Sequence, residues 1–234
     1  MKNTKKILIT GSGEGIGLEV VKLFIKNKWH VDAHYFQKDK ELDSIKKNIK
    51  KIKCDFSKKK DLEIFLKKIS NTRYDGLLNC AGVFDKSKNY TNRLVNISKT
   101  IQVNTIAPIF ILEKVFENMK KARRGNIVNI SSIGVKFGSS SDNIFYGVSK
   151  LGLEASTKTY SREGSKYNIL VNTIRPGITN TNFYKKIGKD LKDRVKLIPL
   201  KRAANPDEIA NFIYFMISQN TFITGETIAI SGGE

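Results

Sequence analysis

The chain has 234 residues, 40% of them hydrophobic, and no apolar run is long enough to cross a membrane. Its 42 Lys and Arg residues against 22 Asp and Glu give a formal net charge of +20, but the lysines are dispersed and no aromatic residues interleave with them as a base-stacking surface requires. We therefore expect one basic domain over residues 1–234 that binds neither nucleic acid nor membranes. Because the N-terminal segment lacks an apolar signal region, we also expect a cytoplasmic protein.

The first predicted strand, at residues 7–10, runs directly into a glycine-rich turn over residues 11–17. Apolar residues after the turn predict a helix to about Lys28. A helix N-terminus offers unpaired N–H groups and the positive end of a dipole, and glycines let the backbone come close to a ligand. The pattern therefore predicts a phosphate site, and the alternative is a glycine-rich turn that binds nothing.

The rest of the chain alternates in the same way. Further strands are predicted at 29–36, 51–54, 74–79, 125–130, 169–174 and 227–231, and helices at 41–50, 60–70 with Ser57 as N-cap, 96–115, 146–165 and from 205 onwards. This alternation predicts an α/β fold with a doubly wound parallel sheet of about seven strands, helices covering both faces. Ligands bind beyond the carboxyl ends of such strands, where the irregular segments 83–93, 133–145 and 178–201 also lie.

Cys54 and Cys80 are the only cysteines, and neither has neighbours at metal-ligand spacing. Both fall at the ends of predicted strands. We interpret them as small buried thiols in a reducing compartment, and we expect no metal site.

Tyr146 and Lys150 open the predicted helix at 146–165, and their four-residue spacing places both on one helical face. An ammonium beside a phenol favours the phenolate and lowers the pKa of the phenol. Such a pair can pass a proton to or from a carbonyl or alcohol oxygen. The alternative is an exposed Tyr and Lys on a surface helix.

Other polar residues add to this pattern. Ser131 and Ser132 directly follow the strand at 125–130, where a hydroxyl can bind a substrate oxygen or merely cap a turn. Asn104 lies in an apolar helical stretch, which indicates a buried polar role unless the side chain faces solvent.

Taken together, these motifs resemble the short-chain dehydrogenase/reductase family across nearly the whole chain. Residues 10–17 match the family's T-G-x-x-x-G-x-G loop, Tyr146 and Lys150 match its Y-x-x-x-K, and residues 79–82 match N-N-A-G except at Cys80. Residues 175–181, 223–226 and 230–233 resemble its remaining signatures. The resemblance implies a single-domain Rossmann fold and an oxidoreductase that transfers a hydride between NAD(P)(H) and a carbonyl or secondary alcohol. The alternative is a nucleotide-binding regulator of the same fold without turnover.

By this resemblance, Tyr146 is the general acid–base, Lys150 lowers its pKa and binds the nicotinamide ribose, Ser132 orients the substrate carbonyl, and Asn104 holds a relay water. The separation of Ser132 from Tyr146 is one residue longer than usual in the family, which suggests an insertion between them. The implied cofactor-binding residues are Gly11, Ser12, Gly13, Glu14, Gly15, Ile16, Gly17, Tyr35, Phe36, Asp55, Phe56, Asn79, Ala81, Gly82, Tyr146, Lys150, Pro176, Gly177, Ile178 and Thr181. The expected substrate walls include Phe84, Ile133, Phe137 and Phe183, and residues 178–201 are expected to form a mobile lid.

The cofactor is expected to be NADP(H) or NAD(H), with a slight preference for NADP(H). No acid stands near Tyr35, where NAD enzymes usually hold the ribose diol, and Lys38 is near enough to meet a 2′-phosphate. Against this, the carboxylate of Glu14 would repel that phosphate.

The substrate is expected to be a small carbonyl or alcohol compound, free or carrier-bound, since the pattern most resembles 3-oxoacyl-carrier-protein reductases. Lys121, Arg123 and Arg124 either meet an acidic carrier protein or are plain surface charges. By the resemblance we also expect a homotetramer or homodimer, assembled through the helices at 96–115 and 146–165.

Overall fold

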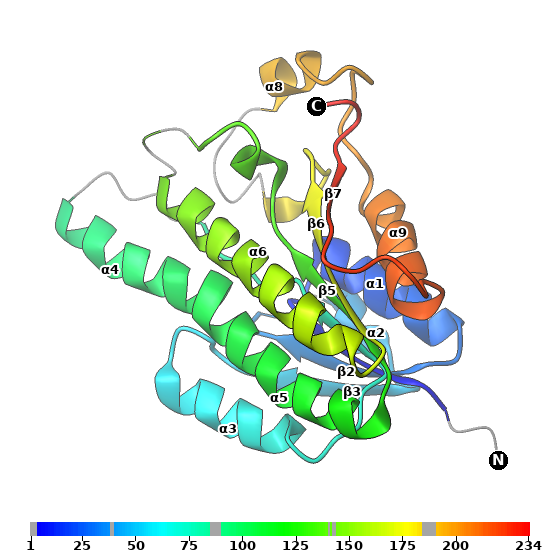
Figure 1. Ribbon diagram of the computed structural model, residues 1–234. Helices are drawn as coiled ribbons and strands as arrows, with labels where there is room; N and C mark the ends of the chain where they lie inside the picture. Colours follow the sequence, from blue (N-terminus) through cyan, green and yellow to red (C-terminus); the bar gives the residue numbers. More distant parts are fainter. Residues whose placement is uncertain (1–3, 38–39, 85–89, 140, 142–143, 184–190) are drawn as a thin grey trace.

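The computed structural model describes residues 4–37, 40–84, 90–139, 141, 144–183 and 191–234. Its centre is a parallel sheet of seven strands in the order β3-β2-β1-β4-β5-β6-β7 (Figure 1). The strands are β1 (Lys6–Thr10), β2 (His30–Tyr35), β3 (Ile49–Lys53), β4 (Gly76–Asn79), β5 (Gly125–Ile130), β6 (Ile169–Pro176) and β7 (Thr227–Ile230). The predicted doubly wound sheet is confirmed, and its strand order reverses between β1 and β4, where such sheets bind ligands.

Helices cover both faces of the sheet (Figure 1). Helices α1 (Gly15–Lys26) and α9 (Pro206–Ser218) pack together on one face. The other face carries α3 (Lys59–Ile69), α4 (Tyr90–Ile101), α5 (Ala107–Ala122) and α6 (Ile144–Ser165). The short helix α2 (Lys40–Ser44) packs Leu42 into the core beneath α1, whereas α8 (Lys192–Lys196) lies apart from the sheet, at the top of Figure 1.

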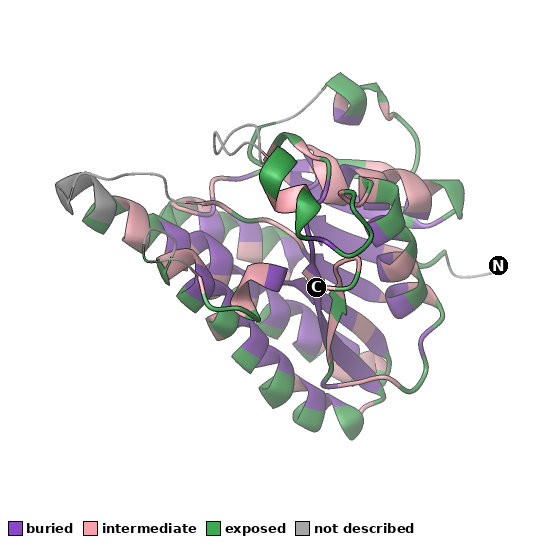
Figure 2. Ribbon diagram, turned by 90° about the horizontal axis from the view of Figure 1, so that it is seen from above, coloured by how far each residue is buried: buried purple, intermediate pink, exposed green. Residues whose placement is uncertain are grey.

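The central strands β1, β4, β5 and β6 supply side chains to two separate cores, because successive residues of a strand point to opposite faces. In β1, Ile7 and Ile9 enter the core beneath α1 and α9, whereas Leu8 enters the core beneath α3 and α5. Leu77 and Leu78 of β4 divide in the same way. Figure 2 shows the result, with buried residues concentrated in the sheet and on the helix surfaces that face it.

The predicted helices before and after β3 differ from those in the structure. The lysine-rich helix expected at 41–50 ends at Ser44, and Ile49 already begins β3, because this stretch offers only Leu42 as a buried anchor for α2. The N-cap position of α3 falls to Lys58 rather than Ser57. Ser57 instead donates its N–H (3.0 Å) and its hydroxyl (2.6 Å) to the carboxylate of Asp55.

The helix predicted at 96–115 is longer than expected and is not a single α-helix. It begins at Tyr90, passes through a π-helical turn at Gln102–Ile106, and continues as α5 to Ala122. Turns of this kind are frequent at functional sites, and this one contains Asn104. By contrast, the predicted start of α9 is confirmed, since Asn205 and Glu208 form a capping box with Pro206 in the first turn.

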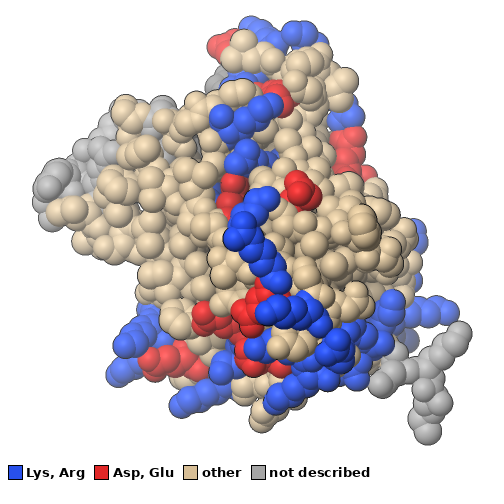
Figure 3. Space-filling model, in the orientation of Figure 1, with Lys and Arg blue, Asp and Glu red and all other residues tan. Residues whose placement is uncertain are grey.

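On the face shown in Figure 3, charged side chains are densest at the lower end of the molecule, and fewer lie above it. Lysine and arginine are spread from α8 to the opposite end of the molecule, with acidic side chains among them. In the part of the chain that the structure describes, no helix combines the length and the apolar character needed to cross a membrane.

Candidate active site

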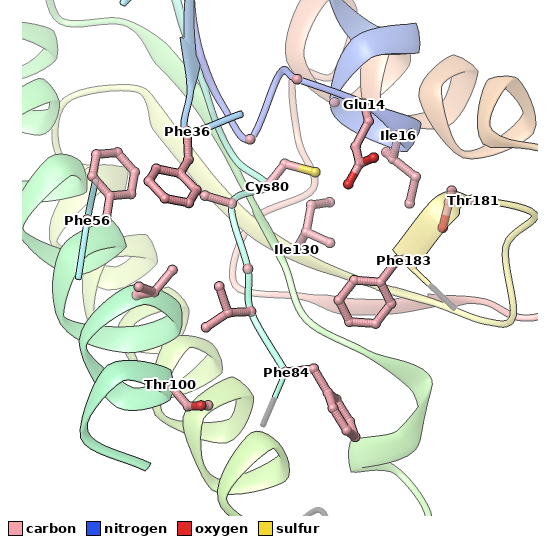
Figure 4. A pocket seen from close by; sticks show the side chains of 18 of the residues that line it. Glu14, Ile16, Phe36, Phe56, Cys80, Phe84, Thr100, Ile130, Thr181 and Phe183 are labelled. Carbon is pink, nitrogen blue, oxygen red and sulfur yellow. The ribbon is translucent and has the colours of Figure 1, made fainter. Parts of the chain in front are cut away.

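A cavity of about 650 Å³ lies beyond the carboxyl ends of the strands (Figure 4). Its walls come from the segments that follow β1 to β6 and from the first turns of α6. Of the residues expected at the site, those that line it are Gly11, Gly13, Glu14, Gly15, Ile16, Gly17, Phe36, Asp55, Phe56, Ala81, Gly82, Phe84, Ser132, Tyr146, Lys150, Pro176, Thr181 and Phe183. The fold therefore brings together motifs that are up to 170 residues apart, counted from Gly11 to Thr181.

The glycine loop after β1 is packed against the end of β4. Gly11 adopts a positive φ of 71°, and a Cβ there would lie 2.7 Å from the backbone of Ala81. The hydroxyl of Thr10 accepts the N–H groups of Cys80 at 3.0 Å and Ala81 at 3.2 Å. These contacts hold the N-terminus of α1 beside the cavity, where the positive end of the helix dipole suits an anion.

Tyr146 and Lys150 lie on the same face of α6 and both line the cavity. The Nζ of Lys150 lies 5.9 Å from the centroid of the Tyr146 ring and donates to the carbonyl of Ile130 at 2.8 Å. The Lys150 side chain is almost fully buried, and burial lowers its pKa to about 8. The arrangement places an ammonium close to a phenol in a sheltered site.

Ser132 and Tyr146, which both carry a hydroxyl group, line the same cavity. Its Oγ accepts the N–H of Gly134 at 3.2 Å and so caps the short 3-10 turn Ile133–Val135. Ser131 is the alternative hydroxyl from the sequence, but it is buried and donates to the carboxylate of Glu154 at 2.5 Å. Both serines line the cavity, but the hydroxyl of Ser131 already donates its proton to Glu154, whereas that of Ser132 accepts from Gly134.

Asn104 is 0% exposed and does not line the cavity, although it was expected among the catalytic residues. Its Oδ1 accepts the N–H of Val83 at 2.8 Å, and its Nδ2 donates to the Val83 carbonyl at 2.9 Å and to the Ser149 hydroxyl at 3.0 Å. Asn104 thus fixes the segment after β4 against the first turns of α6.

Five residues expected to bind a cofactor lie behind the cavity wall rather than in it: Ser12, Tyr35, Asn79, Gly177 and Ile178. The Ser12 hydroxyl donates a hydrogen bond to the carbonyl of Ile9 at 2.9 Å. Asn79 donates to the Asn129 side chain at 2.9 Å and to the carbonyl of Pro108 at 3.2 Å, joining β4 to β5 and α5. The Ser12 hydroxyl and the Asn79 amide nitrogen are therefore used within the protein, whereas Oδ1 of Asn79 is buried without a hydrogen-bond partner among the described residues.

Two of the four expected substrate residues do not reach the cavity. Ile133 is turned into the interior by the capped 3-10 turn, and Phe137 is 57% exposed on the outer surface. Phe84 and Phe183 do line it, with ring centroids 5.1 and 6.4 Å from that of Tyr146 and 6.3 Å from each other. Figure 4 shows these two rings at one end of the cavity, and Phe36 and Phe56 at the other.

The cavity is also lined by residues that were not expected at the site, and Cys80 and His34 are two of them. Cys80 is half-buried and lines the cavity, which corrects the expectation of a buried thiol, although burial of the thiol still raises its pKa to about 11. His34 lines it from β2. Its place near the end of a strand beside a phosphate loop was the only signal in the sequence.

The basic residues considered as a contact for a carrier protein lie at the end of the sheet opposite to the cavity. Lys121, Arg123 and Arg124 precede the amino end of β5, whereas the cavity lies beyond its carboxyl end, about 20 Å away for a six-residue strand. Arg124 pairs with Asp75 at 2.8 Å, and Arg123 donates to the carbonyl of Lys166 at 3.1 Å. This geometry disfavours a role in delivering a substrate to the cavity.

No cluster of three or more His, Cys, Asp or Glu residues that could hold a metal ion occurs within the described residues.

Comparison with known proteins gives one consistent relationship. A family model described as enoyl-(acyl carrier protein) reductase matches residues 11–234. The chain is 30% identical over 244 residues to the 3-oxoacyl-(acyl-carrier-protein) reductase of Chlamydia pneumoniae, covering 98% of this chain and 96% of that protein. Among solved structures, ElxO with NADP bound is 30% identical, with a TM-score of 0.85 over 99% of this chain and 98% of that one. A 4-hydroxyisoleucine dehydrogenase complexed with NADH is 27% identical, with a TM-score of 0.88 over 98% of both chains. By its glycine loop, its Tyr-Lys pair and these matches, the chain belongs to the short-chain dehydrogenase/reductase family of oxidoreductases.

Proposed function

We propose that this chain transfers a hydride between NAD(P)(H) and a carbonyl or secondary alcohol, with Tyr146 as the general acid–base. The observation that carries the proposal is that Tyr146, Lys150 and Ser132 line one cavity together with the glycine loop at the N-terminus of α1. A phosphate-binding loop and a proton-transfer pair in one cavity are what a dinucleotide-dependent oxidoreductase requires.

The residues of the cavity fit a dinucleotide. The glycine loop would hold the pyrophosphate, Asp55 and Phe56 would flank the adenine, and Lys150, Pro176 and Thr181 would hold the nicotinamide end. The bound cofactor supplies the hydride, and the protein supplies position, a proton and an electrostatic field.

Among the described residues, the wall near the end of β2 offers Phe36 and Gln37 rather than a carboxylate, which favours NADP(H). Lys38, the cation expected to meet the 2′-phosphate, lies outside the described residues. Glu14 also lines the cavity and favours NAD(H), because its carboxylate would repel a 2′-phosphate. The relatives include structures with NADP and with NADH, and we retain the preference for NADP(H).

In the reducing direction, the phenol of Tyr146 gives its proton to the substrate oxygen as negative charge develops there. The ammonium of Lys150 favours the phenolate that remains. The hydroxyl of Ser132 donates a hydrogen bond to the same oxygen. Asn104 acts indirectly, by holding the Val83 backbone and Ser149 in place.

The substrate is proposed to be a small carbonyl or alcohol compound, because Phe84 and Phe183 border the cavity beside Tyr146. Residues 178–201 are proposed to close over it. Within this segment Ile178 and Ile198 are buried, Phe183 lines the cavity, and residues 184–190 lie outside the described part of the chain.

A homodimer or homotetramer is proposed to form through α4 to α6. These helices carry large apolar side chains that are exposed in the single chain: Leu94, Val95, Phe110, Val148 and Leu151. Exposed apolar surface of this kind marks association sites. Sedimentation of the purified protein tests this, and a monomer at micromolar concentration would contradict it.

The test of the function is oxidation of NADPH and NADH in the presence of a ketone panel that includes β-keto thioesters. We expect turnover with at least one ketone, and Tyr146→Phe should lower kcat by about 10²–10⁴-fold, the usual contribution of general acid catalysis. The Kd for the cofactor should remain within about threefold of the wild-type value, which is a change in binding free energy of less than about 1.4 kcal/mol. Tight cofactor binding without turnover across the whole panel would favour a regulator instead.

A further inference from the structure

His34 lies at the carboxyl end of β2, between β1 and β3 in the sheet, and is only 2% exposed. Its ring bridges the two neighbouring strands where their hydrogen-bonded ladders end. Nδ1 lies 3.2 Å from the N–H of Gly11, and Nε2 lies 3.1 Å from the carbonyl oxygen of Cys54. A backbone N–H can only donate and a carbonyl can only accept, so the ring is the neutral tautomer with its proton on Nε2.

On one side, His34 holds the start of the glycine loop. Its ring accepts the N–H of Gly11, and its backbone carbonyl accepts the N–H of Ser12 at 2.8 Å. Gly11 has a positive φ and no room for a side chain against Ala81, so this conformation depends on its surroundings. The His34 residue therefore fixes where the loop leaves the sheet.

On the other side, His34 holds the turn after β3. Cys54, whose carbonyl it binds, directly precedes Asp55 and Phe56, both of which line the cavity. The imidazole stacks on the Phe56 ring, with centroids 3.8 Å apart and planes 9° from parallel. One imidazole thus contacts both the phosphate loop and the turn that would flank the adenine.

We infer that His34 is a positioning residue that sets the distance between the glycine loop and the Asp55–Phe56 turn, and thereby the affinity for the ADP half of the cofactor. This inference rests on the proposed function, because it assigns these two segments to the two ends of the ADP group. Buried among the rings of Phe56 and Phe65, His34 has its pKa lowered to about 4, so it keeps its acceptor toward Gly11 at neutral pH.

The decisive comparison uses two variants of His34 and one control. His34→Leu keeps an apolar volume but leaves the Gly11 N–H and the Cys54 carbonyl without their partner, whereas the amide of His34→Gln carries an acceptor and a donor that can replace both contacts. Phe65→Leu is the control, since Phe65 touches the ring edge-on with centroids 5.4 Å apart but makes neither hydrogen bond. Each protein is titrated with ADP by calorimetry, and its thermal stability is measured.

We expect His34→Leu to weaken ADP binding about tenfold or more, equivalent to about 1.4 kcal/mol, while His34→Gln and Phe65→Leu stay within about threefold. At saturating NADPH, kcat and the KM for the ketone should change little in His34→Leu, because the nicotinamide end is not touched. A purely structural residue would not give this separation of cofactor affinity from kcat, nor rescue by Gln.

The inference is overturned if His34→Leu binds ADP as tightly as wild type, or if Phe65→Leu loses as much ADP affinity at an equal loss of stability. It is also overturned if wild type binds no ADP, in which case the proposed function fails with it. If wild type binds ADP, the Leu variant does not, and no ketone is turned over, then His34 keeps this role and only the proposed reaction fails.

Discussion

The carboxylate of Glu154 grips the guanidinium of Arg175 with both oxygens, at 2.7 Å from Nε and 2.6 Å from Nη2. The same carboxylate accepts the hydroxyl of Ser131 at 2.5 Å. Glu154 lies four residues after Lys150 on α6, and Arg175 directly precedes Pro176 at the end of β6. This contact therefore ties the helix that carries the Tyr-Lys pair to the ends of β5 and β6.

Removing the Glu154 carboxylate should be costly. Glu154→Ala leaves Arg175, whose side chain is mostly buried, without its counter-ion and Ser131 without its acceptor. We expect the free energy of unfolding to fall by about 3 kcal/mol, typical of breaking a buried pair, as measured by urea denaturation. Asp193→Ala, which breaks the exposed pair with Lys196, is the control and should change stability by less than about 0.5 kcal/mol. A loss below about 1 kcal/mol in Glu154→Ala would show that the contact is not stabilising.

Asn104 should affect turnover indirectly, because its side chain positions the backbone of Val83. Asn104→Ala removes the partners of the Val83 N–H and carbonyl, which should lower stability by about 2 kcal/mol and also lower kcat, because Val83 leads into Phe84 beside Tyr146.

The matched control is Asn118→Ala on the same run of helix. Its amide donates to the carbonyls of Ser70 and Thr72, far from the cavity along the chain and in the fold. It should lose stability while kcat is unchanged. Steady-state kinetics and denaturation on both variants provide the test, and equal effects on kcat would rule out a specific role for Asn104.

Local patterns explain what the sequence could predict. The strand that leads into the glycine-rich turn at residues 11–17, the Tyr-Lys spacing and the capping box of α9 each depend on residues close together in the chain, and all three appear as expected. The parallel sheet followed from alternation alone.

Contacts between distant segments explain what it could not predict. His34 owes its place to Gly11 and Cys54, which become its neighbours only through the strand order of the sheet. Ile133 and Phe137 belong to a loop of the correct rim, but loop length does not tell which side chains turn inward; the cap at Ser132 decides that.

The buried ammonium of Lys150 should give the enzyme a pH limit. Its pKa is lowered to about 8 by burial, so above that pH the free protein loses the positive charge beside Tyr146. The value of kcat/KM for the cofactor, which reports groups of the free enzyme, should therefore fall about tenfold per pH unit above pH 8. Glu154→Gln should move this limit to lower pH, since the Glu154 carboxylate opposes the effect of burial. A profile that stays flat well above pH 8 in wild type would contradict the assignment.

The neutral imidazole of His34 should make folding sensitive to mild acid. Its pKa is about 4 in the folded chain and 6.5 in a model peptide, so between these values the unfolded chain takes up a proton that the folded chain refuses. The stabilisation is fully present above about pH 6.5 and is lost as the pH falls toward 4, by up to ~3 kcal/mol. His34→Gln, which cannot titrate, should lack this part of the acid sensitivity, whereas Phe65→Leu should keep it. Urea denaturation of the three proteins at neutral and at mildly acidic pH measures the difference, and parallel losses in wild type and His34→Gln would mean that folding does not lower the pKa of the imidazole.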